Sequence, residues 1–454
     1  MKHLTLTSLT VFLLASCSLI PDYERPAVET PATWSAEKYS KPVQIAYDWW
    51  RSFKSEELNS LMQGTLINNT DIRAGLQTIE QSRAALKIAG ADLLPSASGS
   101  GGASKTRTNP ASGKTTTSTS LSAGLDISYE LDLFGANRAD VEAARASLQS
   151  SLYEQDSLAL VVMGEVATGY FTLLDLYERL AIADSNLANA REVLRIIEAR
   201  VREGMESDIE LTQQTSAVAT SEASRSSLVE QIANAENALA VLLGKAPQTI
   251  EITRRQLDAL QVPDIAAGQP SDLLERRPDI RAAEANLRAA NADIGAARAA
   301  FFPSVSLGAG STISWAGLGD PSATIFSLAS SLSAPIFQGG RLQGGLDQAT
   351  ARQLELVETY RGTVLTSFQE VEDALAAVKS ARDREISLKT AMEQAQRAYS
   401  LTKNRYDAGQ IDFETLLDTQ NAQLSAEDSY AQAKLARLTA AVDLYKALGG
   451  SWNS

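Results

Sequence analysis

The chain of 454 residues repeats itself, and this repeat limits its possible folds more than any other feature. Four short landmarks recur in one order, about 205 residues later in the chain. The pairs are LLPS (93–96) and FFPS (301–304), FGANR (134–138) and FQGGR (337–341), RVREG (200–204) and RYDAG (405–409), and LLG (242–244) and ALG (447–449). Such self-similarity indicates one supersecondary plan that is used twice.

Each copy predicts a helix, a β-hairpin, a very long helix, a glycine turn and a returning helix. The expected helices cover about 57–92, 139–203, 208–243, 273–300, 342–407 and 410–448. A helix of some 65 residues is a rod of about 100 Å. The predicted domains are a signal peptide (1–16), an N-terminal segment (17–56), a first repeat (57–244, hairpin 96–133), a linker (245–270) and a second repeat (271–454, hairpin 304–337).

The return strand of the first hairpin, LSAGLDISYELDLF (121–134), alternates between apolar and polar residues. Because the side-chain period of a strand is two, one face is apolar and the other carries Asp126, Glu130 and Asp132. Four strands of about 10 to 13 residues are long enough to cross a bilayer when tilted. Lipid leaves no backbone group unpaired, so membrane strands must close into a barrel, and four strands are too few. We therefore expect several chains to share one barrel, with the three carboxylates facing its lumen.

The scarcity of reactive side chains argues against an enzyme. The sequence has one histidine and one cysteine, His3 and Cys17, both at the N-terminus. This excludes a catalytic triad, a cysteine nucleophile and a zinc site built from histidine or cysteine in the rest of the chain. Phosphate-binding glycine motifs are also missing, and the net charge of −14 argues against a nucleic-acid partner. We expect no cofactor and no metal.

The first residues, MKHLTLTSLTVFLLASCS, have the charge and the short apolar run of a secretory signal. The run ends in Leu14-Ala15-Ser16-Cys17, which resembles the bacterial lipobox. That resemblance implies cleavage after Ser16 and a lipid on Cys17, with Ser18 favouring sorting to the outer membrane. Acyl chains would anchor the N-terminus to a leaflet.

Several further stretches carry a resemblance that covers residues 17–454. They are CSLIPDYERP (17–26), DWWRSF (48–53), LINNTDIRAGL (66–76), YELDLFG (129–135), LLERRPDI (273–280), ADIGAARAAFFPSVSL (292–307), RYDAGQIDFETLLDTQ (405–420) and ALGGSW (447–452). In these stretches the chain resembles TolC-type outer-membrane efflux ducts, in the OprM/CusC/NodT-like lipoprotein branch that serves resistance-nodulation-division pumps.

The resemblance implies a mainly α fold with membrane β structure. Three chains would form a homotrimer, with a 12-stranded β-barrel continuous with a long α-helical barrel in the periplasm. It implies a passive exit duct in the outer membrane, in contact with its lipid. The partners would be a periplasmic adaptor (membrane fusion) protein and an inner-membrane resistance-nodulation-division transporter that delivers drugs or other small toxic compounds.

The resemblance also implies a periplasmic gate at the glycine turns. Asp418 matches the family's aperture aspartate, and Glu414 lies one turn earlier, where some relatives have an apolar plug. Tyr406 matches a linking tyrosine, and Arg405 is the candidate to replace a linking arginine that is absent here. If the constriction lies elsewhere, the Gly204 turn offers its own carboxylates, which are Glu206, Asp208 and Glu210.

Two other interpretations stay open at this stage. One is the outer-membrane channel of a type I protein secretion system, which shares the fold but has another pump. The other belongs to a different class, a structural periplasmic coiled-coil lipoprotein with a small soluble sheet. The transported substrate is not readable from the sequence.

Overall fold

A computed structural model describes residues 18–35, 48–111, 113–317 and 321–450 of the chain. The predicted signal peptide (1–16) and Cys17 lie outside these described residues. The elements are η2 (Trp49–Phe53), α2 (Glu56–Asn68), α3 (Thr70–Ala91), β1 (Ser96–Thr108), β2 (Thr116–Leu131), α4 (Ala136–Arg202), α5 (Asp208–Leu242), η3 (Leu257–Ala259), η4 (Pro270–Asp272), α6 (Leu273–Arg276), α7 (Pro278–Ala299), β3 (Ser304–Ala316), β4 (Pro321–Ser333), α8 (Arg341–Asp407) and α9 (Phe413–Ala447).

The chain divides into two compact units, and each unit draws on both sequence repeats. Unit 1 consists of Met1–Ala27, Thr78–Tyr153 and Ala282–Gly362, and unit 2 of Val28–Gln77, Glu154–Arg281 and Thr363–Ser454. The helices α4 and α8, of 67 residues each, contribute to both units. The repeat is therefore visible in the order of the elements along the chain. Each compact unit of the folded chain nevertheless combines segments from both copies.

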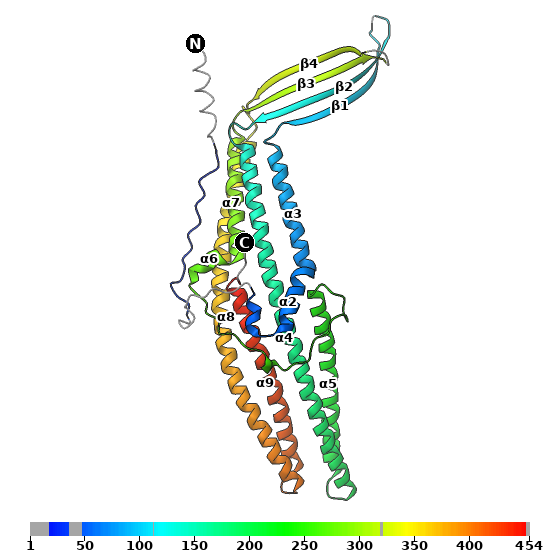
Figure 1. Cartoon of the computed structure of the whole chain (residues 1–454), viewed down its shortest axis with the longest axis vertical. Helices are drawn as coiled ribbons and strands as arrows, with labels where there is room; N and C mark the ends of the chain where they lie inside the picture. Colours follow the sequence, from blue (N-terminus) through cyan, green and yellow to red (C-terminus); the bar gives the residue numbers. More distant parts are fainter. Residues whose placement is uncertain (1–17, 36–47, 112, 318–320, 451–454) are drawn as a thin grey trace. The chain divides into compact units, whose positions relative to one another are not determined.

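Unit 1 contains a single four-stranded antiparallel sheet in the order β1-β2-β3-β4 (Figure 1). Its register places apolar residues opposite one another, as in Ala97↔Ile127↔Ala309. The other face carries serine pairs whose hydroxyls lie 2.7–2.8 Å apart across neighbouring strands. They are Ser96 and Ser128, Ser104 and Ser120, and Ser306 and Ser331. The predicted two-faced sheet is thus present, and part of its polar face is hydrogen-bonded internally.

The strand ends differ from the predicted ones. The second hairpin was expected to reach residue 337, but β4 ends at Ser333 because Pro335 has no backbone N–H to donate to a ladder. The first hairpin ends at Leu131, so Asp132 is outside the strand. Its carboxylate instead accepts hydrogen bonds from the backbone N–H groups of Asn137 and Arg138 in the first turn of α4.

An N-terminal strap, residues 18–27, also belongs to unit 1 and lies along α7. Asn291 donates to the backbone oxygen of Pro21 over 2.7 Å. The carboxylate of Glu284, only 5% exposed, pairs with Arg25 of the strap and with Arg288, at 2.7 Å in each case. Burial opposes ionisation of Glu284, but the hydrogen bonds from the two arginines outweigh it and lower its pKa. The strap is therefore held by a buried, paired charge.

Unit 2 has an aromatic core that the DWWRSF stretch supplies. Trp49 stacks on Tyr445 with ring centroids 5.0 Å apart, and Phe53 packs against Phe171 at the same distance. Trp34 donates its indole N–H to the backbone oxygen of Gly268 over 3.0 Å and so ties the linker between the repeats to this unit. Apolar burial around these rings is the main stabilising contribution here.

Two helices that we predicted as continuous are broken, at equivalent places in the two repeats. Asn69 ends α2 and caps α3 by accepting from the backbone N–H of Ile72 over 3.0 Å. Arg277 separates α6 from α7 because the following Pro278 disfavours a helical conformation before it. Each break residue also donates to the end of its repeat's last helix, Asn69 to the oxygen of Leu242 at 2.7 Å and Arg277 to that of Ala447 at 2.9 Å.

The same contacts explain why the LLG and ALG landmarks end in glycine. Gly244 and Gly449 have φ values of +65° and +83°, which favour glycine. A Cβ atom on Gly244 would also lie 2.1 Å from the backbone oxygen of Asn68, and one on Gly449 would lie 3.1 Å from the Cα of Arg277. The broken helices and the two glycines therefore form one structural motif, used twice.

Candidate functional site

The two glycine turns at the ends of α4 and α8 have the same backbone geometry. Gly204 and Gly409 have φ values of +71° and +69°. The next residue donates back to the last helical turn in each case, Met205 to the oxygen of Arg200 over 2.8 Å and Gln410 to that of Arg405 over 2.9 Å. This is a Schellman helix end, which requires a residue with positive φ. The two turns therefore have the same hydrogen-bond pattern.

A polar cluster joins the two turns, and we call it the tip latch: Arg200, Glu206 and Tyr406. The Tyr406 hydroxyl donates to the Glu206 carboxylate over 3.2 Å. Arg200 pairs with the same carboxylate at 3.2 Å, donates to the backbone oxygen of Tyr406 over 3.1 Å, and lies 4.4 Å above the Tyr406 ring. The latch therefore connects the end of α8 to the end of α4 and its turn.

Apolar packing supports the latch from one side. Tyr406 is 1% exposed and lies in a buried cluster with Val193, Ile197, Tyr399, Phe413 and Leu416. Burial, followed by the neighbouring charge of Glu206, raises the pKa of Tyr406 to about 12. The phenol consequently stays protonated at neutral pH and can donate to Glu206 throughout the physiological range.

Arg405, the candidate to replace the absent linking arginine, is exposed and forms no ion pair among the described residues. Within one chain, the arginine that contacts Tyr406 is Arg200. In the repeat alignment of RVREG with RYDAG, Arg200 is the residue equivalent to Arg405. A linking role for Arg405 therefore stays a prediction about neighbouring chains.

The two predicted gate carboxylates lie on the first turns of α9. Asp418 and Glu414 are both exposed. The helix is started by Asp412, whose carboxylate accepts from the backbone N–H of Thr415 over 2.8 Å. Within one chain these two carboxylates face solvent and do not meet the latch, so a gating role for them depends on neighbouring chains.

The alternative carboxylates at the Gly204 turn are partly engaged within the chain. Glu206 belongs to the latch. Glu210 accepts from the backbone N–H of Ser207 over 3.1 Å in a capping box, and the hydrogen bond from the Ser207 side chain lowers its pKa. Asp208 is exposed in the same turn.

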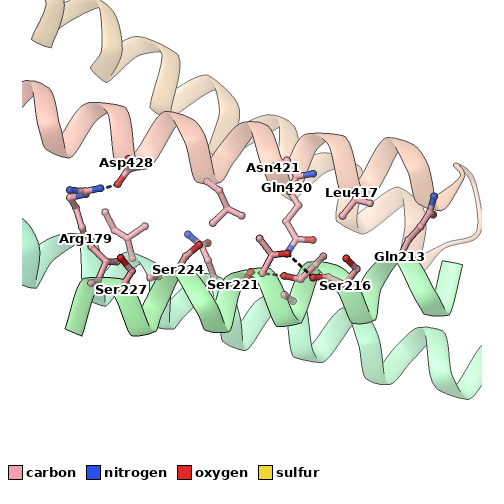
Figure 2. Close-up of a pocket in the computed structure, with 18 of the residues that line it drawn as sticks. Arg179, Gln213, Ser216, Ser221, Ser224, Ser227, Leu417, Gln420, Asn421 and Asp428 are labelled. Atoms are coloured by element: carbon pink, nitrogen blue, oxygen red, sulfur yellow. Dashed lines mark hydrogen bonds and ion pairs between the residues drawn. The ribbon is translucent and has the colours of Figure 1, made fainter. Parts of the chain in front are cut away.

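A groove of about 1140 Å³ lies between α5 and α9, with α4 forming its floor (Figure 2). Short hydroxyl side chains of α5 line one wall, including Ser216, Ser221 and Ser224. The ion pair between Arg179 and Asp428, at 2.6 Å, closes the end that is far from the turns. The lining is mixed, because apolar side chains such as Ile182, Leu417 and Leu424 lie among these hydroxyl groups.

The two strand carboxylates keep their predicted face. Asp126 and Glu130 are exposed, and the register pairs them with Gly310 and Ser306 on the face that also carries the serine pairs. A Cβ atom on Gly310 would lie 2.9 Å from a carboxylate oxygen of Asp126, so that side chain extends over β3. Asp132 does not share this face, since its carboxylate binds the α4 start and Arg138 at 2.9 Å.

The described residues contain no cluster of three or more histidine, cysteine or carboxylate side chains able to hold a metal ion. Among the same residues, one helix, α4, has a stretch long and apolar enough to cross a membrane by length and composition. Half of that stretch is buried inside the protein, as in the core helix of a soluble protein, so this is weak evidence for a span.

Comparison with known proteins identifies the family. A model of the outer membrane efflux protein family matches residues 61–245 and 269–450. The pyoverdine export outer membrane protein OpmQ of Pseudomonas aeruginosa is 39% identical, across 100% of this chain and 98% of its own length. The probable efflux pump outer membrane protein TtgC of Pseudomonas putida is 34% identical, across 99% of this chain and 96% of its own.

The fold agrees with a solved member of this group. The open-state MtrE outer membrane channel of Neisseria gonorrhoeae has a TM-score of 0.85 and 32% identity, covering 96% of this chain and 98% of its own. The family model spans well over half of the chain, and the curated relatives align over nearly their whole length. The chain therefore belongs to the outer membrane efflux protein family.

Proposed function

We propose that this protein is the passive exit duct of a tripartite efflux pump, built from three identical chains. The single observation that carries the proposal is the four-stranded sheet with one apolar and one polar face. Its outer strands β1 and β4 each have an unpaired edge within the chain. Edges in lipid must be paired, and β1 of one chain can pair with β4 of the next. Three chains give a 12-stranded barrel, within the size range of bacterial membrane barrels.

The polar face then lines the lumen, with Asp126 and Glu130 among its serines, while Leu125 and Ile127 meet lipid. Both of these apolar side chains are exposed in the single chain, at 53% and 43%. This division fits a water-filled duct, because polar cargo needs a wetted wall and lipid needs an apolar one.

The periplasmic partners follow from the efflux assignment. We propose that an adaptor protein docks on the helical tips and that an inner-membrane resistance-nodulation-division transporter supplies the energy. Relatives carry names that refer to different cargos, pyoverdine for OpmQ and toluene for a TtgC of Pseudomonas putida. A wide polar duct suits this variety better than a specific binding site does. We therefore propose small toxic compounds or secreted metabolites as cargo.

We further propose that Cys17 is acylated after cleavage behind Ser16. The strap supports this, because it carries the chain from residue 27 along α7 to Leu19, whose backbone oxygen accepts from Arg298 in the last turn of that helix. Residue 18 therefore lies near the α7 end that leads into β3. Intact-mass measurement of membrane-extracted protein should show an N-terminal acylated Cys17, and an unmodified or different N-terminus would refute this.

The gate proposal combines the latch with the exposed carboxylates. In a trimer, Asp418 and Glu414 of three chains would place up to six carboxylates around one opening, a field that attracts cations. Asp418→Asn with Glu414→Gln should lower cation selectivity and block by multivalent cations in planar bilayers. The matched control is Asp383→Asn with Glu393→Gln, two exposed carboxylates on α8 away from the tip turns. Unchanged selectivity in the first variant would place the constriction elsewhere.

The whole function is tested by complementation. A strain that lacks its own duct should regain resistance to the pump's substrates when this protein is supplied with its cognate adaptor and transporter. Restored secretion of a protein substrate without restored resistance would favour the type I secretion interpretation. A protein that forms no pores in bilayers would favour the structural coiled-coil interpretation.

A further inference from the structure

The charged residues of the sheet are separated by face. Four residues of β1–β4 carry charge: Asp126, Glu130, Lys105 and Arg107. The acids lie on the polar face described above. The register pairs Lys105 with Thr119 and Arg107 with Thr117, which continues the face of Leu121 and Leu125. Both cations therefore lie on the apolar face, the one that meets lipid in the proposed barrel.

The height of these cations follows from the same register. Leu121 pairs with Trp315 on β3 and with Ala103 on β1. Lys105 and Arg107 lie one and two rows beyond that level, about 7 and 13 Å further along the strand. Between Leu121 and Leu131 the strand rises about 33 Å, which at a typical tilt gives the apolar band of about 25 Å that membrane barrels show. Lys105 and Arg107 therefore lie just beyond the end of the apolar band.

Three features make this position a binding surface for anionic head groups. Tryptophan marks the boundary between apolar and polar membrane regions, and Trp315 occupies the row just before the cations. Lysine and arginine on a lipid-facing wall are tolerated only near such a boundary, where their long side chains reach the head groups. Lys105 and Arg107 are exposed, and neither forms an ion pair with another described residue.

The hairpin tips identify the leaflet. The cations lie at the β1–β2 turn, at the opposite end of the strands from α3 and α4, which enter and leave the hairpin (Figure 1). If the helices extend into the periplasm, as the proposed duct requires, this end faces the cell exterior. A glycolipid with phosphate groups in the leaflet there would carry a charge opposite to that of the two side chains.

We infer that Lys105 and Arg107 bind the phosphate groups of an outer-leaflet glycolipid of the lipid A type. This inference rests on the proposed barrel. Each chain offers one pair of cations two residues apart on one face, and arginine can bind a phosphate oxygen pair through two parallel N–H groups. The overall charge of −14 gives no general attraction to anionic lipid, so binding depends on this local pair.

The test titrates the purified protein in neutral detergent with lipid A that carries both phosphates and with dephosphorylated lipid A, and measures bound lipid by native mass spectrometry. Each cation near an anionic surface contributes about fivefold in binding, so Lys105→Thr with Arg107→Thr should weaken binding of the phosphorylated lipid about 30-fold. Lys105→Gln and Arg107→Gln alone should each give about fivefold. The dephosphorylated lipid should bind all variants equally weakly.

A matched control keeps the charges but moves them to the other face. Adding Ser104→Lys and Thr106→Arg to the double variant restores the net charge, preserves strand length and places both cations toward the lumen. This protein should fail to recover lipid binding. Equal binding by wild type, double variant and face-swapped variant, or no preference of wild type for the phosphorylated lipid, would overturn the inference. Channel conductance is recorded on the same samples. If the wild-type protein shows no conductance, the result counts against the exit duct and not against lipid binding.

Discussion

We predict that the Tyr406 hydroxyl group, through its hydrogen bond in the tip latch, holds the duct closed. Tyr406→Phe removes the hydrogen bond to Glu206, over 3.2 Å, and leaves the ring in its apolar cluster. We propose that widening of the tunnel mouth separates the end of α8 from the end of α4. The latch is then present only in the closed state, and its loss shifts the equilibrium toward opening.

The size of the shift follows from the geometry. A hydrogen bond to a charged group contributes about 1.5–3 kcal/mol. The Glu206 side chain is 18% exposed and keeps its pair with Arg200, so the lower end of this range applies. A change of about 1.4 kcal/mol is tenfold in an equilibrium constant. Tyr406→Phe should therefore raise the open population about tenfold.

The assay is single-channel recording in planar bilayers, with uptake of a large antibiotic by intact cells as a second readout. Glu206→Gln should also raise opening, because it weakens both the Tyr406 hydrogen bond and the Arg200 pair. Adding Tyr406→Phe to Glu206→Gln should therefore change little. Tyr399→Phe is the matched control, since Tyr399 is buried in the same cluster and its hydroxyl has no hydrogen-bond partner among the described residues. Equal conductance in Tyr406→Phe, Tyr399→Phe and wild type would refute the latch.

Two further predictions concern charges buried along the helices. Burial raises the pKa of Asp175 to about 6 from 3.8, so ionisation of this carboxyl destabilises the fold fully above about pH 6 and not at all below about pH 4. In thermal denaturation, Asp175→Asn should therefore raise the free energy of unfolding by about 2 kcal/mol at pH 7.5 and leave it unchanged at pH 4. Asp184→Asn, on the exposed side of α4, should leave the free energy of unfolding unchanged at both pH values. Glu284→Gln should release the strap and speed chymotrypsin cleavage after Tyr23 about tenfold, whereas Glu142→Gln, which removes an exposed pair with Arg145, should leave the rate unchanged.

The long helices and their turns could be predicted because glycine and proline mark them in the sequence. Gly204 and Gly409 end helices through positive φ, and Pro95 and Pro303 precede the hairpins. The breaks at Asn69 and Arg277 were missed. An asparagine inside an amphipathic run is a weak signal by itself, and its role depends on the Leu242 carbonyl oxygen that only the folded chain brings near.

The candidate site was predictable in its place but not in its partners. The turns themselves and Tyr406 came from local sequence, whereas the contact with Arg200 spans 206 positions and arises from packing of one repeat on the other. Asp132 was misplaced for a local reason. Alternation continued past Leu131 in the sequence, but the backbone turned there to start α4, and the carboxylate became its cap.

The mass of the intact complex tests the central claim most directly. The account requires that unpaired edges of β1 and β4 close between chains, so native mass spectrometry in mild detergent should give three copies of the chain. Cysteine pairs scanned along the polar faces of β1 and β4 should include a pair that cross-links neighbouring copies into a covalent trimer. A stable monomer or dimer with functional pores, or cross-links confined to single chains, would contradict a barrel shared by three copies.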